Sequence, residues 1–67
     1  MEINRRLSLA GCWGMVNRIE SASDPNEVRR RCIIAEEWLK ANIVISDDDF
    51  DDLMRAVSYI YRESYHN

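Results

Sequence analysis

Apolar residues recur every three or four positions along three stretches of the chain, which is the spacing of one face of an α-helix. The three stretches cover residues 4–21, 25–41 and 47–64. Two breaks separate them, a polar segment that ends in Asp24 and Pro25 and the β-branched run 43–45. The pattern predicts an all-α protein, a small antiparallel three-helix bundle that forms a single domain over residues 1–67.

Each predicted helix starts at a residue that can cap it. Asn4 can act as the N-cap of the first helix. Asp24 can cap the second, and Pro25 at the first helical position loses no hydrogen bond there. Ser46 and Asp49 have the spacing of a capping box at the third start. These residues support the three boundaries independently of the apolar spacing.

Two glycines lie inside the first predicted helix. Gly11 and Gly14 each weaken a helix by about 1 kcal/mol relative to Ala. We expect them to permit the close approach of another backbone, with a bend in the helix as the alternative.

The apolar stripes also predict a register, because antiparallel neighbours face each other symmetrically about the loop that joins them. For the first two helices the predicted pairs are Val16 with Val28, Cys12 with Cys32, and Leu9 with Ala35. For the last two they are Leu39 with Phe50, Ala35 with Met54, Cys32 with Val57, and Val28 with Tyr61. Cys12 and Cys32 are therefore expected to lie close together as small buried residues, with a redox or metal pair as the alternative.

Composition narrows the class of protein. Hydrophobic residues make up 46% and charged residues 31%, as in a folded domain. Two Cys and the absence of a secretory leader pattern predict a cytoplasmic protein with reduced thiols. The apolar stretch 41–45 is far shorter than the roughly 20 residues of a membrane span. We therefore expect no membrane partner.

Acidic residues are concentrated where the third helix begins. The run consists of Asp47, Asp48, Asp49, Asp51 and Asp52. Acids in a first turn are favoured by the helix dipole, which explains one or two of them. The excess leaves room for contact with a basic protein surface or for mimicry of nucleic acid, whereas the spacing does not fit a calcium loop.

Arginines are concentrated in the first half of the chain, where six Arg face four acids and give a charge of +2. The clusters are Arg5 with Arg6, and Arg29, Arg30 and Arg31. We expect ordinary surface charge paired with Glu27, Glu36 and Glu37. The alternative is a nucleic-acid interface on these arginines, which is disfavoured because the third helix begins with acids rather than basic residues.

Several apolar and aromatic residues are not needed to fill the predicted core. They are Ile33, Ile34, Trp38, Val44, Tyr59 and Tyr65. Such residues are typical of surfaces covered by a second subunit or by a partner. They predict that the bundle self-associates and, with Asp47, Asp48, Asp51 and Asp52, they are the candidate residues for binding a partner.

Residues 39–54 resemble the short helical hairpin of SHOCT-type domains. The resemblance rests on an apolar connector, a Ser cap, acids and a Phe, namely Leu39, Ile43, Ile45, Ser46, Asp49, Phe50 and Leu53. It implies a small oligomerising or protein-binding module, and it implies no catalytic residue.

The sequence predicts a protein that is not an enzyme. His66 is the only histidine and lies next to the last residue, and no serine has the partners of a triad. We therefore expect no catalytic residue, cofactor or metal. The predicted function is a protein-interaction module, an adaptor or inhibitor of a larger protein, of the size of small bacterial or phage accessory proteins. The alternatives are a nucleic-acid-associated regulator and a mimic of nucleic acid.

Overall fold

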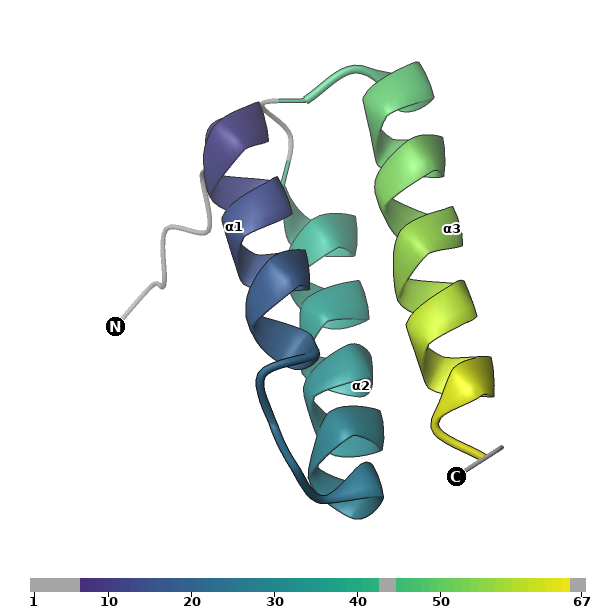
Figure 1. Cartoon of the computed structure of the whole chain (residues 1–67). Helices are drawn as coiled ribbons and strands as arrows, with labels where there is room; N and C mark the ends of the chain where they lie inside the picture. The colour runs from purple at the N-terminus through teal and green to yellow at the C-terminus, as the bar shows by residue number, and fades with distance from the viewer. Residues whose placement is uncertain (1–6, 43–44, 66–67) are drawn as a thin grey trace.

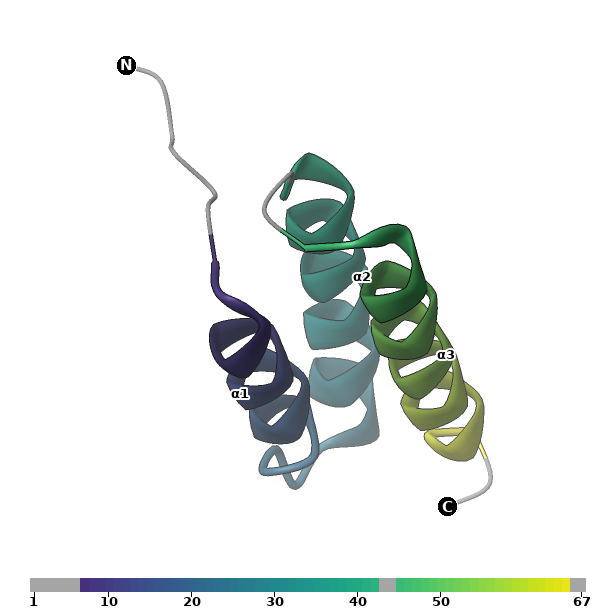
Figure 2. The same ribbon diagram turned by 90° about the horizontal axis from the view of Figure 1, so that it is seen from above.

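Three α-helices run along the chain, each antiparallel to the one before it (Figure 1). The structure is a computed structural model, and it describes residues 7–42 and 45–65. The helices are α1 (Leu9–Ile19), α2 (Pro25–Ala41) and α3 (Asp47–Glu63). Each helix packs against the other two, and the view from above shows the three arranged as the corners of a triangle (Figure 2). The predicted all-α three-helix bundle is confirmed.

The first helix begins later than its apolar pattern predicts. Ser8 is its N-cap, and the Ser8 Oγ accepts a hydrogen bond from the Gly11 N–H at 3.1 Å. The carbonyl of Leu7 accepts a hydrogen bond from the buried Asn42 side chain at 3.0 Å, so it is not used in a helical turn. The predicted helical start is therefore wrong at Leu7 and Ser8, and Asn4 lies outside the described residues.

The other helix starts agree with their predicted caps. The Asp24 carboxylate accepts a hydrogen bond from the Asn26 N–H at 3.0 Å, and Pro25 is the first residue of α2. The Ser46 Oγ accepts one from the Asp49 N–H at 3.2 Å. It also donates to the Asp49 carboxylate, so the two side chains close the cap together.

The two glycines of α1 do not mark a close approach between helices. A Cβ on Gly14 would meet no atom within 4 Å. A Cβ on Gly11 would lie 3.3 Å from the Oγ of Ser8, which belongs to the cap of the same helix. The predicted close approach is therefore wrong.

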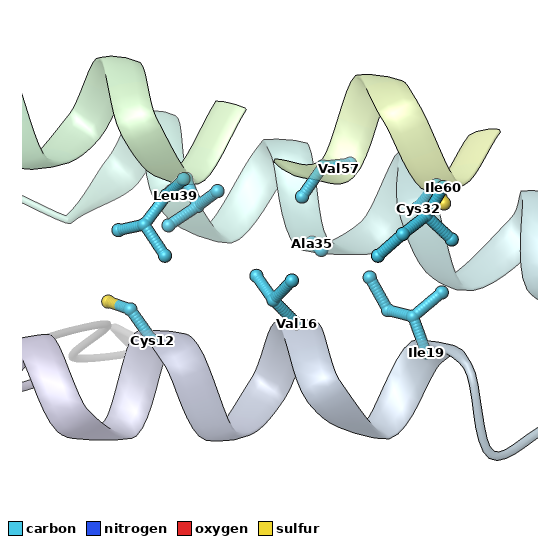
Figure 3. Close-up of a cluster of buried hydrophobic side chains, with 9 residues drawn as sticks. Cys12, Val16, Ile19, Cys32, Ala35, Leu39, Val57 and Ile60 are labelled. Carbon is cyan, nitrogen blue, oxygen red and sulfur yellow. The ribbon is translucent and has the colours of Figure 1, made fainter. Parts of the chain in front are cut away.

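The core consists of three buried residues from each helix (Figure 3). They are Cys12, Val16 and Ile19 of α1, Cys32, Ala35 and Leu39 of α2, and Leu53, Val57 and Ile60 of α3. All nine recur at three- or four-residue spacing, so each helix buries one stripe. Partly buried side chains such as Trp13 and Phe50 close the edges of this core.

The register of α1 against α2 differs from the predicted one. Figure 3 shows Cys12 at the end of the core occupied by Leu39, and Cys32 at the opposite end, at the level of Ile19. The Cys12 Sγ is 3.2 Å from the side-chain nitrogen of Asn42, which lies at the end of α2. The predicted proximity of Cys12 and Cys32 is therefore wrong by about two helical turns.

The loop between α1 and α2 explains this displacement. The predicted register requires a reversal centred on Ala22. Instead α1 ends at Ile19, and the loop continues along the axis of the bundle before α2 begins at Pro25 (Figure 1). Arg31 holds α2 in this register against α1, because its guanidinium donates a hydrogen bond to the Arg18 carbonyl at 2.9 Å. The first turns of α2 therefore extend beyond the end of α1.

The register of α2 against α3 is displaced as well, by about one turn. Cys32 lies at the level of Ile60 in Figure 3, where Val57 was predicted. Arg29 donates a hydrogen bond to the carbonyl of Ser64 at 3.3 Å, at the end of α3. Ser64 is itself buried, and this contact draws the end of α3 toward the start of α2.

Candidate protein-binding surface

A second stripe of side chains runs along α2, on the side opposite the core. It consists of Arg30, Ile33, Ile34 and Glu37, at the helical spacing of three, four and seven residues. Ile33 is 51% exposed and Ile34 is 46% exposed. We call these four residues the outer α2 strip. It places two large apolar side chains in water at the centre of a charged helix face.

A shallow groove between α1 and α2 borders the strip at Ile34. The groove is lined by Met15, Arg18, Ile19, Ser21, Arg31, Ile34 and Ala35. Trp38, one turn further along α2, is half-buried. Val44, the fourth apolar candidate from the sequence, lies outside the described residues. The apolar surface of α2 therefore continues from the strip toward α1.

Glu27 organises the charges at the start of α2. Its carboxylate lies 2.8 Å from the Arg30 guanidinium and 3.4 Å from that of Arg31. The hydrogen bond from Arg30 lowers the pKa of Glu27, and the same contact raises the pKa of Arg30. Glu27 is the acid in both ion pairs found among the described residues. Glu37 therefore has no ion-pair partner among these residues.

Arg29 connects the start of α2 to the end of α3. Its guanidinium hydrogen-bonds the side chain of Asn26, the carbonyl of Ser64 and the Ser64 hydroxyl. It also lies over the Tyr65 ring, 4.4 Å from the ring centre. The Tyr65 and Tyr61 rings meet edge to face, and the hydrogen bond between their hydroxyls raises the pKa of Tyr61. Tyr65 is therefore part of an intrachain contact, although its ring stays largely exposed.

These contacts occupy the arginines on which a nucleic-acid interface would depend. Arg29 binds the end of α3, Arg30 binds Glu27, and Arg31 binds Glu27 and the end of α1. Phosphate binding would compete with each of these partners. Arg5 and Arg6 lie outside the described residues. The three guanidinium groups of α2 are therefore directed to different parts of the bundle.

The acidic run lies exposed along the first turns of α3. Asp49 completes the cap with Ser46, which gives it a structural role. The other four, Asp47, Asp48, Asp51 and Asp52, are exposed. Among the described residues, none of these four has an ion-pair partner. They present negative charge to solvent at this end of the bundle.

The aromatic candidates do not form one surface. Tyr59 is 61% exposed and lines a groove with the α1–α2 loop and the first turns of α2. Tyr65 lies on the other side of α3, against Arg29. The structure therefore separates two residues that the sequence grouped.

The potential metal ligands of the described residues form no cluster. No three His, Cys, Asp or Glu residues of these segments are placed to hold a metal ion. Cys12 and Cys32 are free and buried, and burial raises the pKa of the Cys32 thiol. None of the helices in these segments is long and apolar enough to cross a membrane.

Comparison with known proteins finds no matching family model, no similar curated protein and no similar solved structure. The resemblance of residues 39–54 to SHOCT-type domains therefore stays a prediction.

Two residues of the outer α2 strip are not among the partner-binding candidates that the sequence indicates. The sequence groups Arg30 with its neighbouring arginines, and it predicts that Glu37 pairs within the chain. Their helical position is the available signal, because both lie about half a turn away from the buried face of α2. The structure adds that Glu37 is unpaired within the described chain, while Ile33 and Ile34 lie between the two charges.

Proposed function

We propose that this chain is a non-enzymatic protein-interaction module, an adaptor or inhibitor of a larger protein, that acts through the outer α2 strip. The observation that carries the proposal is the exposure of Ile33 and Ile34, about half of each side chain, on a helix whose opposite face fills the core. Exposed apolar residues bordered by charges are typical of protein contact surfaces.

The proposal includes a cytoplasmic location. Its support is that Cys12 and Cys32 are both buried as free thiols in separate parts of the core. Paired cysteines contribute most to small domains in oxidising compartments, whereas unpaired buried ones suit a reducing compartment.

Affinity capture from a nuclease-treated native lysate tests the proposal. We expect the wild-type chain to recover a protein at defined stoichiometry, and the Ile33→Asp/Ile34→Asp variant to lose it. The matched control is Asn17→Asp/Ser58→Asp, which adds the same two charges at exposed positions on α1 and α3. The control should recover the protein as the wild type does.

Two results would contradict the proposal. Equal recovery by the Ile33→Asp/Ile34→Asp variant would remove the outer α2 strip as the binding surface. Recovery that disappears with nuclease treatment would favour the arginines and a nucleic-acid partner. A third variant separates the mimic alternative, because loss of the partner on changing Asp47, Asp48, Asp51 and Asp52 to Asn would assign the contact to the acidic run.

A further inference from the structure

The outer α2 strip carries opposite charges at equal distances from its centre. Ile33 and Ile34 occupy the middle, with Arg30 one turn before them and Glu37 one turn after them. Arg30 and Glu37 project from nearly the same side of α2, because almost two full turns separate them. A half-turn rotation about the centre of the strip therefore exchanges the positions of positive and negative charge.

We infer that a second copy of this chain occupies the outer α2 strip when no larger protein is bound there, in a two-fold symmetric dimer whose α2 helices run antiparallel. The inference rests on the proposed function, because it names a partner for the same surface. Arg30 of one copy then faces Glu37 of the other, and the reciprocal pair lies on the far side of the axis. The four isoleucine side chains meet between these two ion pairs.

Charge selects the antiparallel arrangement over the parallel one. In a parallel two-fold pair, Arg30 would lie against Arg30 of the second copy and Glu37 against Glu37. Like charges at matched positions of two helices repel each other. In the antiparallel arrangement the same side chains form two pairs of opposite charge, which attract each other.

The strip is also complementary to itself, so a second copy fits it without any change of surface. An unrelated partner would need an apolar centre with an acid and a base at the same spacing and in reverse order. The chain already has this surface in Arg30, Ile33, Ile34 and Glu37, so self-pairing satisfies it without a further component. The exposed carboxylate of Glu37, which has no intrachain ion pair in the described segments, then gains a partner.

The strength of this dimer follows from its size. Each copy contributes one helix face, so the buried area lies at the small end of specific interfaces and association depends on concentration. The isoleucines supply the apolar burial, and the ion pairs at its edge supply orientation and sensitivity to salt.

Sedimentation equilibrium over a range of protein concentrations tests the inference. At low salt we expect a reversible dimer for the wild type. Arg30→Glu and Glu37→Arg each place two like-charged pairs in the interface, so each should weaken dimerisation at least about tenfold. The double variant Arg30→Glu/Glu37→Arg inverts both charges and should restore the dimer.

An equimolar mixture of the two single variants provides a second measurement. In the mixed dimer the two substituted side chains face each other as an acid and a base, and the unchanged Glu37 of one chain faces the unchanged Arg30 of the other. The mixture should therefore dimerise, although each variant alone does so poorly. Circular dichroism of every variant checks that the helices are retained. Glu37→Arg is the cleaner variant, since Arg30→Glu also breaks the ion pair with Glu27.

The inference is overturned by a wild type that stays monomeric at every concentration, or by single variants that dimerise as tightly as the wild type. It is also overturned if the double variant stays monomeric. These outcomes are distinct from failure of the proposed function. A monomer that binds a larger protein through Ile33 and Ile34 removes the inference and leaves the function, whereas a dimer that binds no other protein does the reverse.

Discussion

Gly14 occupies a helix position at which no neighbouring atom requires a glycine. It lies within α1, and a Cβ built on it would meet no atom within 4 Å. Gly11 differs, because its Cβ would crowd the Ser8 oxygen that caps the helix. The backbone entropy of glycine is therefore an avoidable cost at one position and is linked to the cap at the other.

We expect Gly14→Ala to stabilise the protein by about 1 kcal/mol, because alanine lowers the backbone entropy lost on folding and meets no clash. Urea unfolding followed by circular dichroism measures the change. Gly11→Ala is the matched control and should gain less, since its Cβ would lie 3.3 Å from the Ser8 Oγ. Equal gains at both positions would show that the cap adjusts freely.

At the level of the helices, the sequence predicts which residues face the core better than it predicts where helices meet along their length. The buried stripes of α2 and α3 follow the helical period. One side of a helix faces the core every three or four residues, and apolar residues occupy those positions. A shift of two turns keeps the same faces in contact, so the stripes do not select a register. Loop direction and the buried amide of Asn42, which reaches Leu7 and Cys12, select it instead.

The observed register predicts that Cys12 and Cys32 form no disulfide within one folded chain. Cys12 lies at the level of Leu39, about 10 Å along α2 from Cys32, whereas bridged cysteines need Cα atoms within about 7 Å. Mass spectrometry after mild oxidation should find both thiols free. The same oxidant applied in concentrated urea should bridge them, and a bridge in the folded monomer would support the register predicted from the apolar stripes.

The apolar part of the candidate surface can be predicted from the sequence, whereas contacts between distant elements cannot. Ile33 and Ile34 can be recognised as surplus, because the predicted core is filled without them. Contacts that depend on a third element cannot be anticipated. The sequence gives no sign that Arg29 reaches the end of α3, because that contact depends on how far α3 is displaced along α2.

For the molecule as a whole, titration should weaken the fold more on the alkaline side than on the acid side. Burial raises the pKa of Cys32, and the hydrogen bond to Tyr65 raises the pKa of Tyr61. The folded state therefore holds these protons more tightly than the unfolded state does. Tyr61 lies near the surface, where solvent screens its contact, so Cys32 makes the larger contribution. Glu27 acts in the opposite sense, since the Arg30 hydrogen bond lowers its pKa, and solvent screens this contact as well.

The free energy of unfolding should therefore fall as pH rises above about 9, where the unfolded chain ionises before the folded one. The decrease should continue above about pH 10 as Tyr61 joins. On the acid side, the small contribution of Glu27 is present above about pH 4.5 and is lost below it. Urea titrations at a series of pH values measure this profile. Cys32→Ala should flatten its first alkaline step, and an unchanged step in that variant would assign it to another group.

The short first helix has a consequence for how the protein opens. The end of the bundle that holds Cys12 and Leu39 is enclosed by three helices, whereas at the opposite end the α1–α2 loop replaces α1 beside the first turns of α2 (Figure 1). Backbone amides near Val28 are thus covered by fewer helices than those near Leu39. Local unfolding should start at the loop end, and deuterium should enter there first, while the exchange of the amides around Leu39 reports global unfolding.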